Sequence, residues 1–268
     1  MIILIHTSKT MRPPASENSQ GLSQPVLLEK TNELAGYLKT LTSNDIEKTM
    51  KVSEKLATIT KDLISNWNDE PGYQRAAIDS FLGDIYSGLQ VATLTDEDRA
   101  YADEHLRILS GLYGILKPLD GIYPYRFEMG YRVPDNRYTN LYTFWGTSIA
   151  DTFAQNETII DLSAVEYGKT VTRFIESAGI VTRILTPKFL TISPKTGEPS
   201  FVVVHAKIAR GAFAHWMIRN RIEDDARLKD FNEIGYVYDA QLSTKEIPVF
   251  ICKEFKGIGL SIRLTEIT

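Results

Sequence analysis

The stretch from Leu106 to Asp120, LRILSGLYGILKPLD, most constrains how this chain can fold, because two apolar segments are joined by a short turn with a glycine at each end. Thr95 can cap a preceding helix, and the three acidic residues after it suit a positive first turn. Gly111 can take the left-handed conformation that ends a helix, and Gly114 leaves room for backbone N–H groups to approach a phosphate. The pattern predicts a helix-hairpin-helix at about residues 96–118, which binds nucleic-acid backbone without reading bases.

The same turn has a second interpretation. A glycine pair around two apolar residues also forms an ordinary helix–helix corner inside a domain. Leu112 and Tyr113 would anchor the turn in the core in both cases, so they do not separate the two interpretations. Lys117 suits a phosphate neighbour, and it equally suits a solvated helix end before Pro118.

Composition bounds the class of protein. With 268 residues, 43% of them hydrophobic, the chain can bury a large core, and we expect a single globular domain over 1–268. The single cysteine, Cys252, excludes an internal disulfide and favours a reducing cytoplasm; we expect it to be buried in a strand and inert. The opening run Met1–Ile5 is too short for a secretion signal or a membrane span and predicts a buried strand.

Charge is unevenly distributed along the chain. The net charge is -4, which argues against a protein that coats nucleic acid through bulk positive charge. Residues 168–222, however, hold nine basic and two acidic side chains, a local charge of +7 that leaves -11 on the remainder. This asymmetry can confine phosphate binding to one cleft.

Hydrophobic periodicity predicts an α+β protein: a mixed sheet with surrounding helices, assembled largely late in the chain, and the embedded helix-hairpin-helix. Pro187 interrupts one β-rich run and predicts an edge position or a bulge. Helical patterns cover about 26–40, 44–66, 72–81 and 206–221; strand patterns cover 158–162, 181–192 and 201–205, the last two as a hairpin, and 235–239, 248–253 and 261–265.

The helical pattern at 206–221 carries a basic stripe that includes Lys207 and Arg210 beside an apolar face. Such a stripe is commonly just solvated. Gly211 weakens the helix, since an interior glycine costs about 1 kcal/mol relative to alanine, and a turn there would start a new helix at Ala212.

Motifs of the standard enzyme classes are absent from the sequence, and its four histidines lack metal-ligand spacing. We therefore assign no catalytic residue, metal or cofactor. Lys9 and Thr10 directly follow the first strand, where α/β proteins often bind ligands. Asp84 can supply a carboxylate or cap a helix. In the aromatic segment from Tyr123, we expect Leu141, Phe144 and Trp145 to form a buried helix face, and we leave Tyr125 and Arg126 open as cleft residues.

Taken together, these motifs resemble the bacterial peroxide stress response proteins known as YaaA, over nearly the whole chain. The resemblance rests on long ordered stretches, which are more specific than a lone hairpin pattern. They are SKT at 8–10, MKVSEKLA at 50–57, FLGDIYSGL at 81–89, LRILSGLYGILKPLD at 106–120, PYRFEMG at 124–130, LYTFWG at 141–146, DLSAVEY at 161–167, AKIARG at 206–211 and FNEIGY at 231–236.

The resemblance implies a cytoplasmic protein of mixed α/β fold with a helix-hairpin-helix and a basic cleft that binds duplex DNA. We expect no membrane partner and predict no protein partner. It also implies a role in limiting oxidative DNA damage and free intracellular iron. The family usually has Pro-Ala before the Lys-Thr, where this chain has Thr7-Ser8. By this resemblance, the turn residues Ser110, Gly111, Leu112, Tyr113 and Gly114 are expected to contact DNA. We infer from their own charge and position that further contacts come from Lys9, Thr10, Lys117, Arg126, Lys207 and Arg210.

An alternative function stays open: an enzyme acting on a nucleotide or on damaged DNA in the same cleft, with Lys9 and Asp84 beside the reacting group. This alternative rests on the use of helix-hairpin-helix modules in DNA repair enzymes. An iron-binding protein is disfavoured because the sequence lacks a clustered Cys/His site, so any effect on iron would be indirect.

Overall fold

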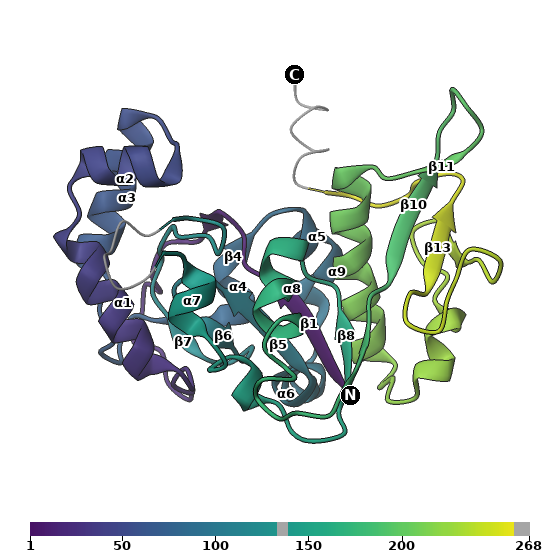
Figure 1. Cartoon of the computed structure of the whole chain (residues 1–268), viewed down its shortest axis with the longest axis horizontal. Coiled ribbons are helices and arrows are strands. Elements are labelled where there is room, and N and C mark those ends of the chain that lie inside the picture. The colour runs from purple at the N-terminus through teal and green to yellow at the C-terminus, as the bar shows by residue number, and fades with distance from the viewer. Residues whose placement is uncertain (133–138, 260–268) are drawn as a thin grey trace.

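The centre of the fold is a five-stranded mixed sheet in the order β6-β5-β1-β8-β9 (Figure 1). The computed structural model describes residues 1–132 and 139–259. Every residue of β1 is buried, as expected of a strand with parallel neighbours and helices on both faces. β1 pairs in parallel with β5 and β8, and only β6 runs antiparallel. The strands are β1 (Ile2–His6), β5 (Leu106–Ser110), β6 (Gly114–Leu116), β8 (Thr158–Asp161) and β9 (Arg183–Leu185).

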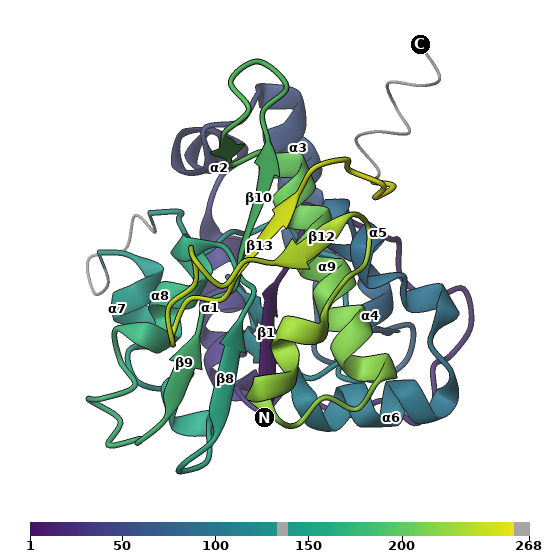
Figure 2. The ribbon, with the colours of Figure 1, turned by 90° about the vertical axis from the view of Figure 1, so that its right-hand side faces the viewer.

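A second, four-stranded sheet in the order β11-β10-β13-β12 lies at one end of the molecule. Helix α9 (Val203–Arg219) packs against β10 of this sheet and against β1 of the central sheet. Figures 1 and 2 show α9 between the two sheets, and its position explains why it is buried on most sides. The strands of the second sheet are β10 (Lys188–Ile192), β11 (Pro199–Ser200), β12 (Tyr236–Tyr238) and β13 (Val249–Cys252).

Three helices form the opposite end of the molecule in Figure 1. Side-chain caps start two of them: Thr42 forms a capping box with Asp45 at the start of α2, and Ser53 accepts from the Leu56 N–H at the start of α3. The three are α1 (Leu28–Thr40), α2 (Ser43–Met50) and α3 (Glu54–Asn66).

Helix α5 (Asp84–Leu89) crosses α9 at very short range because each contributes a glycine to the crossing. A Cβ at Gly88 would lie 2.0 Å from the Ile208 carbonyl oxygen, and one at Gly211 would lie 1.8 Å from the Ile85 carbonyl oxygen. Gly211 therefore does not break the helix. It allows the two backbones to touch, and α9 continues through it to Arg219.

None of the helices among the described residues has the length and apolar character needed to cross a membrane.

Short elements connect the two sheets and the helices described above. The connecting elements are β2 (Thr10–Met11), β3 (Arg75–Ala76), α4 (Ala77–Ser80), β4 (Phe81–Leu82), η1 (Val91–Thr93), α6 (Asp96–His105), β7 (Gly121–Ile122), α7 (Leu141–Trp145), η2 (Ala150–Thr152), α8 (Val165–Thr172) and η3 (Asp225–Asp230).

The predicted helix-hairpin-helix is wrong. Its first helix exists as α6, with the predicted Thr95 cap, but it ends at His105. The rest of the motif is a strand, a turn and a strand, because the apolar run of β5 pairs with β1 inside the central sheet. Gly111 does not adopt the left-handed conformation, whereas Gly114 does, with φ +69°.

Other predictions divide similarly. The α+β class, the mixed sheets and the buried face of α7 are confirmed. Pro187 separates two strands that belong to different sheets, and 201–205 begins a helix where a strand was predicted. The segment 72–81, predicted as a helix, forms mostly short strands and one helical turn. The central sheet was predicted to come largely from the later part of the chain, but it is built around the first strand, β1. The predicted strand at 261–265 lies outside the described residues.

Candidate functional site

Polar residues gather where the parallel strands β5, β1 and β8 end. β1 ends at His6, followed by Thr7; β5 ends at Ser110; and β8 ends at Asp161, followed two residues later by Ser163, and all five are buried. β1 is central, and the chain adds β5 on one side of it and β8 on the other. Ligands of α/β proteins bind at this kind of switch point, outside the carboxyl ends of the strands.

His6 is neutral and has a defined proton position. Its Nδ1 accepts a hydrogen bond from the Ala164 N–H at 3.1 Å, which puts the ring proton on Nε2. The ring packs against Tyr167 with centroids 4.9 Å apart. Burial, and then the charges of Arg210 and Lys207, lower the pKa of His6 to about 3. The Nε2–H is therefore a permanent hydrogen-bond donor near neutral pH.

Hydroxyl groups pack beside His6. Thr7 Oγ1 donates to the Tyr167 hydroxyl at 3.3 Å, and the Ser110 and Tyr125 hydroxyls are 2.5 Å apart. The Tyr86 hydroxyl donates to the His6 carbonyl oxygen at 3.2 Å. Burial raises the pKa of all three tyrosines, so these hydroxyls keep their protons and can serve as donors.

Helix α9 contributes two cations to this region. Lys207 is exposed and Arg210 is partly buried, one turn further along the helix. Burial lowers the pKa of Arg210, and Asp161 opposes that effect. Within the described part of the chain, neither cation makes a hydrogen bond or an ion pair. Asp161 instead holds Ser163, whose N–H and hydroxyl both donate to Oδ1.

Two more cations meet at the loop after β1. Lys9 forms an ion pair with Glu128 at 3.1 Å, and Arg126 donates to the Lys9 carbonyl oxygen at 3.1 Å. The Nε of Arg126 is enclosed and has no acceptor among the described residues. Burial and Glu128 raise the pKa of Glu166, while Lys9 and Lys207 oppose them, so Glu166 lies within electrostatic range of both lysines.

The structure thus brings some predicted residues together and separates others. Lys9, Arg126, Lys207 and Arg210 lie around the end of β1, and Thr10 is exposed in β2 beside them. The turn residues are buried: Ser110, Gly111, Leu112, Tyr113 and Gly114. Their contact with DNA stays a prediction. The sequence analysis assigned no site role to His6, Thr7, Asp161 or Tyr167, although Asp161 and Tyr167 lie within the family motif at 161–167. His6, Thr7 and Asp161 are polar residues at the ends of buried strands, a signal that could have found them.

Lys117 lies elsewhere. Because β6 runs antiparallel to β5, the chain returns along β5, and Lys117 reaches the amino-end edge of the sheet. There it pairs with Asp103 of α6 at 3.7 Å. Asp84, the other candidate carboxylate, lies in the first turn of α5, a position that favours a negative charge at a helix start.

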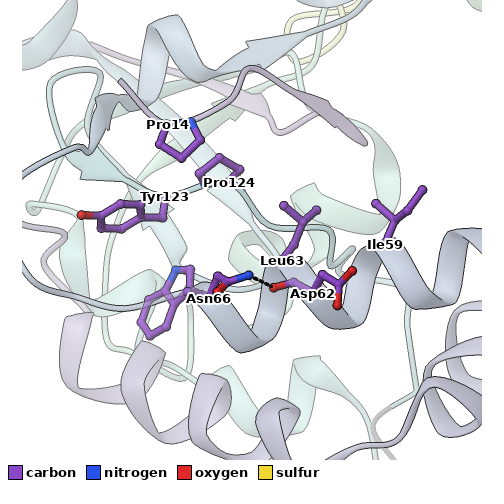
Figure 3. Close-up of a pocket in the computed structure, with 8 residues that line it drawn as sticks. Pro14, Ile59, Asp62, Leu63, Asn66, Tyr123 and Pro124 are labelled. Atoms are coloured by element: carbon purple, nitrogen blue, oxygen red, sulfur yellow. Dashed lines mark hydrogen bonds between the residues drawn. The ribbon is translucent and has the colours of Figure 1, made fainter. Parts of the chain in front are cut away.

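A separate pocket of about 330 Å³ opens between α3 and the segment before Tyr125 (Figure 3). Trp67 lines it and donates its ring N–H to Tyr113 at 2.8 Å. Most of its wall is apolar or aromatic, and it lacks the cations of the first site. Its lining residues are Pro14, Ile59, Asp62, Leu63, Asn66, Trp67, Tyr123 and Pro124.

A family model and several similar proteins place the chain in the same family. The family model described as peroxide stress protein YaaA matches residues 1–242. The chain belongs to the YaaA family. A UPF0246 protein of Salinispora tropica is 56% identical, over 98% of both chains. UPF0246 proteins of a Marinomonas species and of Clostridium beijerinckii are 39% and 36% identical, over 95% and 93% of this chain and 98% and 97% of theirs.

The family membership connects this YaaA protein to the response to peroxide stress. Family membership does not say which ligand or reaction the site takes, so these follow from the geometry of the site. Among the described residues, no three His, Cys, Asp or Glu side chains are grouped as metal ligands would be.

Proposed function

We propose that this YaaA protein acts in peroxide stress by binding the phosphate backbone of duplex DNA at the carboxyl-end edge of its central sheet. The observation that supports this most is the pair Lys207 and Arg210, two cations without acceptors among the described residues. Lys9, Thr10 and Arg126 would extend the same surface. Contacts from such side chains position a protein on DNA without reading sequence.

The helix-hairpin-helix is no part of this proposal, because β5 and β6 occupy its place. Binding would limit oxidative damage by covering DNA during stress, as the resemblance to the family implies. Any effect on free iron would be indirect, since iron favours clustered His, Cys or carboxylate ligands.

Fluorescence anisotropy of a labelled duplex across a salt series tests the proposal. Lys207→Ala and Arg210→Ala should weaken binding, and each lost phosphate contact should lower the log–log salt slope by about 0.9. Lys117→Ala is the matched control, because it removes one surface lysine at the opposite edge and should leave the slope unchanged. Absence of wild-type binding to any duplex, nick, gap or single strand at low salt would refute the proposal.

Substitutions of the turn glycines do not test DNA contact. A Cβ at Gly111 would lie 2.5 Å from the Phe127 carbonyl oxygen, and one at Gly114 would lie 2.9 Å from the Trp145 ring. Both variants would disturb core packing. Loss of binding in them would report misfolding and not a missing contact.

A second candidate function is an enzyme acting on a nucleotide or on damaged DNA. The observation that favours it is the buried group of His6, Thr7 and Ser110 at the switch point, an arrangement unnecessary for a surface that only holds backbone. His6→Asn keeps an acceptor for the Ala164 N–H and removes the Nε2–H donor. If this enzyme function is correct, His6→Asn abolishes product formation while duplex affinity stays within about twofold; if no DNA or nucleotide substrate is converted by wild type, the function is wrong.

A further inference from the structure

Three hydrogen-bond donor groups lie near the carboxyl end of β1, where α9 packs against that strand, and none of them has an acceptor among the described residues. His6 Nε2–H is one, fixed by the hydrogen bond that Nδ1 accepts from Ala164. The Arg210 guanidinium and the Lys207 ammonium are the others, both close enough to His6 for their charges to act on its ring. Asp161 acts on Arg210 electrostatically but makes no ion pair with it.

This arrangement leaves hydrogen-bonding capacity for a ligand. The Arg210 guanidinium has five N–H donors, and none of them bonds an acceptor among the described residues, so an anion can form charge-assisted hydrogen bonds there. Two like charges one helical turn apart repel each other in addition. Arg219, in the last turn of the same helix, and Arg221 just after it differ from Arg210, because both bond Asp98, at 3.3 and 2.8 Å. The contrast indicates that Arg210 and Lys207 are arranged for an external anion.

We infer that His6, Lys207 and Arg210 form a site for a phosphate monoester: the terminal phosphate of a nucleotide or of a DNA strand, in preference to an internal diester. A monoester presents three terminal oxygens to three donor groups, whereas a diester presents two and carries a substituent on each side. The buried position of His6 also favours a chain end over a continuous backbone. The monoester site rests on the proposed DNA binding and deepens it by naming the ligand group that the interior of the site takes.

The difference in exposure between Lys9 and the pair Arg210 and His6 suggests that they bind different phosphate groups. Lys9, whose side chain is 56% exposed, can contact passing backbone at the surface. Arg210 is partly buried and His6 is buried, so both are less accessible to passing backbone than Lys9 is. A guanidinium binds phosphate through two parallel N–H bonds, so Arg210→Lys should lose affinity although the charge is kept.

The experiment compares two short duplexes of one sequence, with 5′-phosphate or 5′-hydroxyl ends, by competition against a labelled duplex. A second arm measures binding of a nucleoside monophosphate, its nucleoside and inorganic phosphate by calorimetry. We expect about tenfold tighter binding of the phosphorylated duplex, and loss of that preference in Arg210→Lys and His6→Asn. Lys195→Ala, on the exposed turn between β10 and β11, is the charge-matched control and should retain the preference.

A thermal melt of a further Arg210 variant shows whether a loss of binding comes from misfolding. Arg210→Met removes a cation that makes no hydrogen bond or ion pair among the described residues, so its thermal midpoint should equal or exceed that of wild type while the phosphate preference disappears. A structural role for Arg210 would instead lower the midpoint, and that result would overturn the inference.

The outcomes separate this inference from the DNA proposal. Equal affinity for the two duplexes, with no binding of the monophosphate, overturns the monoester site even if duplex binding depends on Lys207 and salt. Monophosphate binding that needs Arg210, with no binding of either duplex, supports the site and refutes the DNA proposal.

Discussion

Gly211→Ala offers the sharpest test of how this fold is held together. The added Cβ would lie 1.8 Å from the Ile85 carbonyl oxygen and 2.7 Å from the Leu89 nitrogen, both backbone atoms of α5. Backbone cannot rotate aside as a side chain can, so α5 and α9 must separate by more than about 1 Å to restore normal contact. Overpacking of this kind typically costs up to about 3 kcal/mol, and alanine returns about 1 kcal/mol of helix propensity.

The expected net loss is therefore about 2 kcal/mol, which for a chain of this size lowers the thermal midpoint by about 4–8 °C. Circular dichroism melting and urea unfolding measure it. Gly36→Ala is the matched control: Gly36 is also helical, is exposed, and has nothing within 4 Å of the position that an added Cβ would occupy. That variant should gain up to about 1 kcal/mol. If the two variants were equally stabilised, the close crossing of α5 and α9 would be refuted.

Three further predictions concern buried polar groups. Because the pKa of His6 is about 3 in the folded protein, the unfolded chain takes up a proton that folded His6 does not, and wild type should lose about 2 kcal/mol more than His6→Asn between pH 7 and pH 5 in urea unfolding. A parallel decline in both proteins would contradict this, since the opposite contribution of Asp161, whose pKa is raised, is common to both. Asp98→Ala should lower the free energy of unfolding by about 2 kcal/mol and Thr95→Ala by about 1 kcal/mol, because the Asp98 variant also loses the ion pairs with Arg219 and Arg221. Equal losses would show that only the helix cap contributes to stability. Burial raises the pKa of the Cys252 thiol, so a thiol reagent should react only as fast as the protein unfolds, and rapid labelling of the native state would disprove that.

Part of this fold could be predicted because some signals are local. Thr95 followed by three acidic residues starts a helix in any context, and α6 begins there. A five-residue apolar opening predicts a buried strand, and β1 is one. Pro187 cannot continue a ladder, and the chain changes sheets at that residue.

The Leu106–Ser110 segment could not be assigned in the same way. A short apolar run fits a helix face or a strand equally well, and periodicity alone does not decide between them. The deciding interaction is pairing with β1, which lies about a hundred residues earlier in the chain. Gly211 was ambiguous for a related reason: its role depends on α5, and the sequence of α9 alone shows only a glycine in a helix.

The candidate site shows the same dependence on topology. Lys117 and Lys207 are both lysines near apolar segments, and from sequence each suits a phosphate neighbour. The antiparallel return of β6 carries Lys117 to the amino-end edge of the sheet, where Asp103 neutralises it. α9 instead packs against β1 and brings Lys207 and Arg210 within electrostatic range of His6 at the carboxyl-end edge. The direction of β6 therefore decides that Lys117 lies apart from Lys207 and Arg210. That direction cannot be read from the sequence around Lys117 or from the sequence of α9.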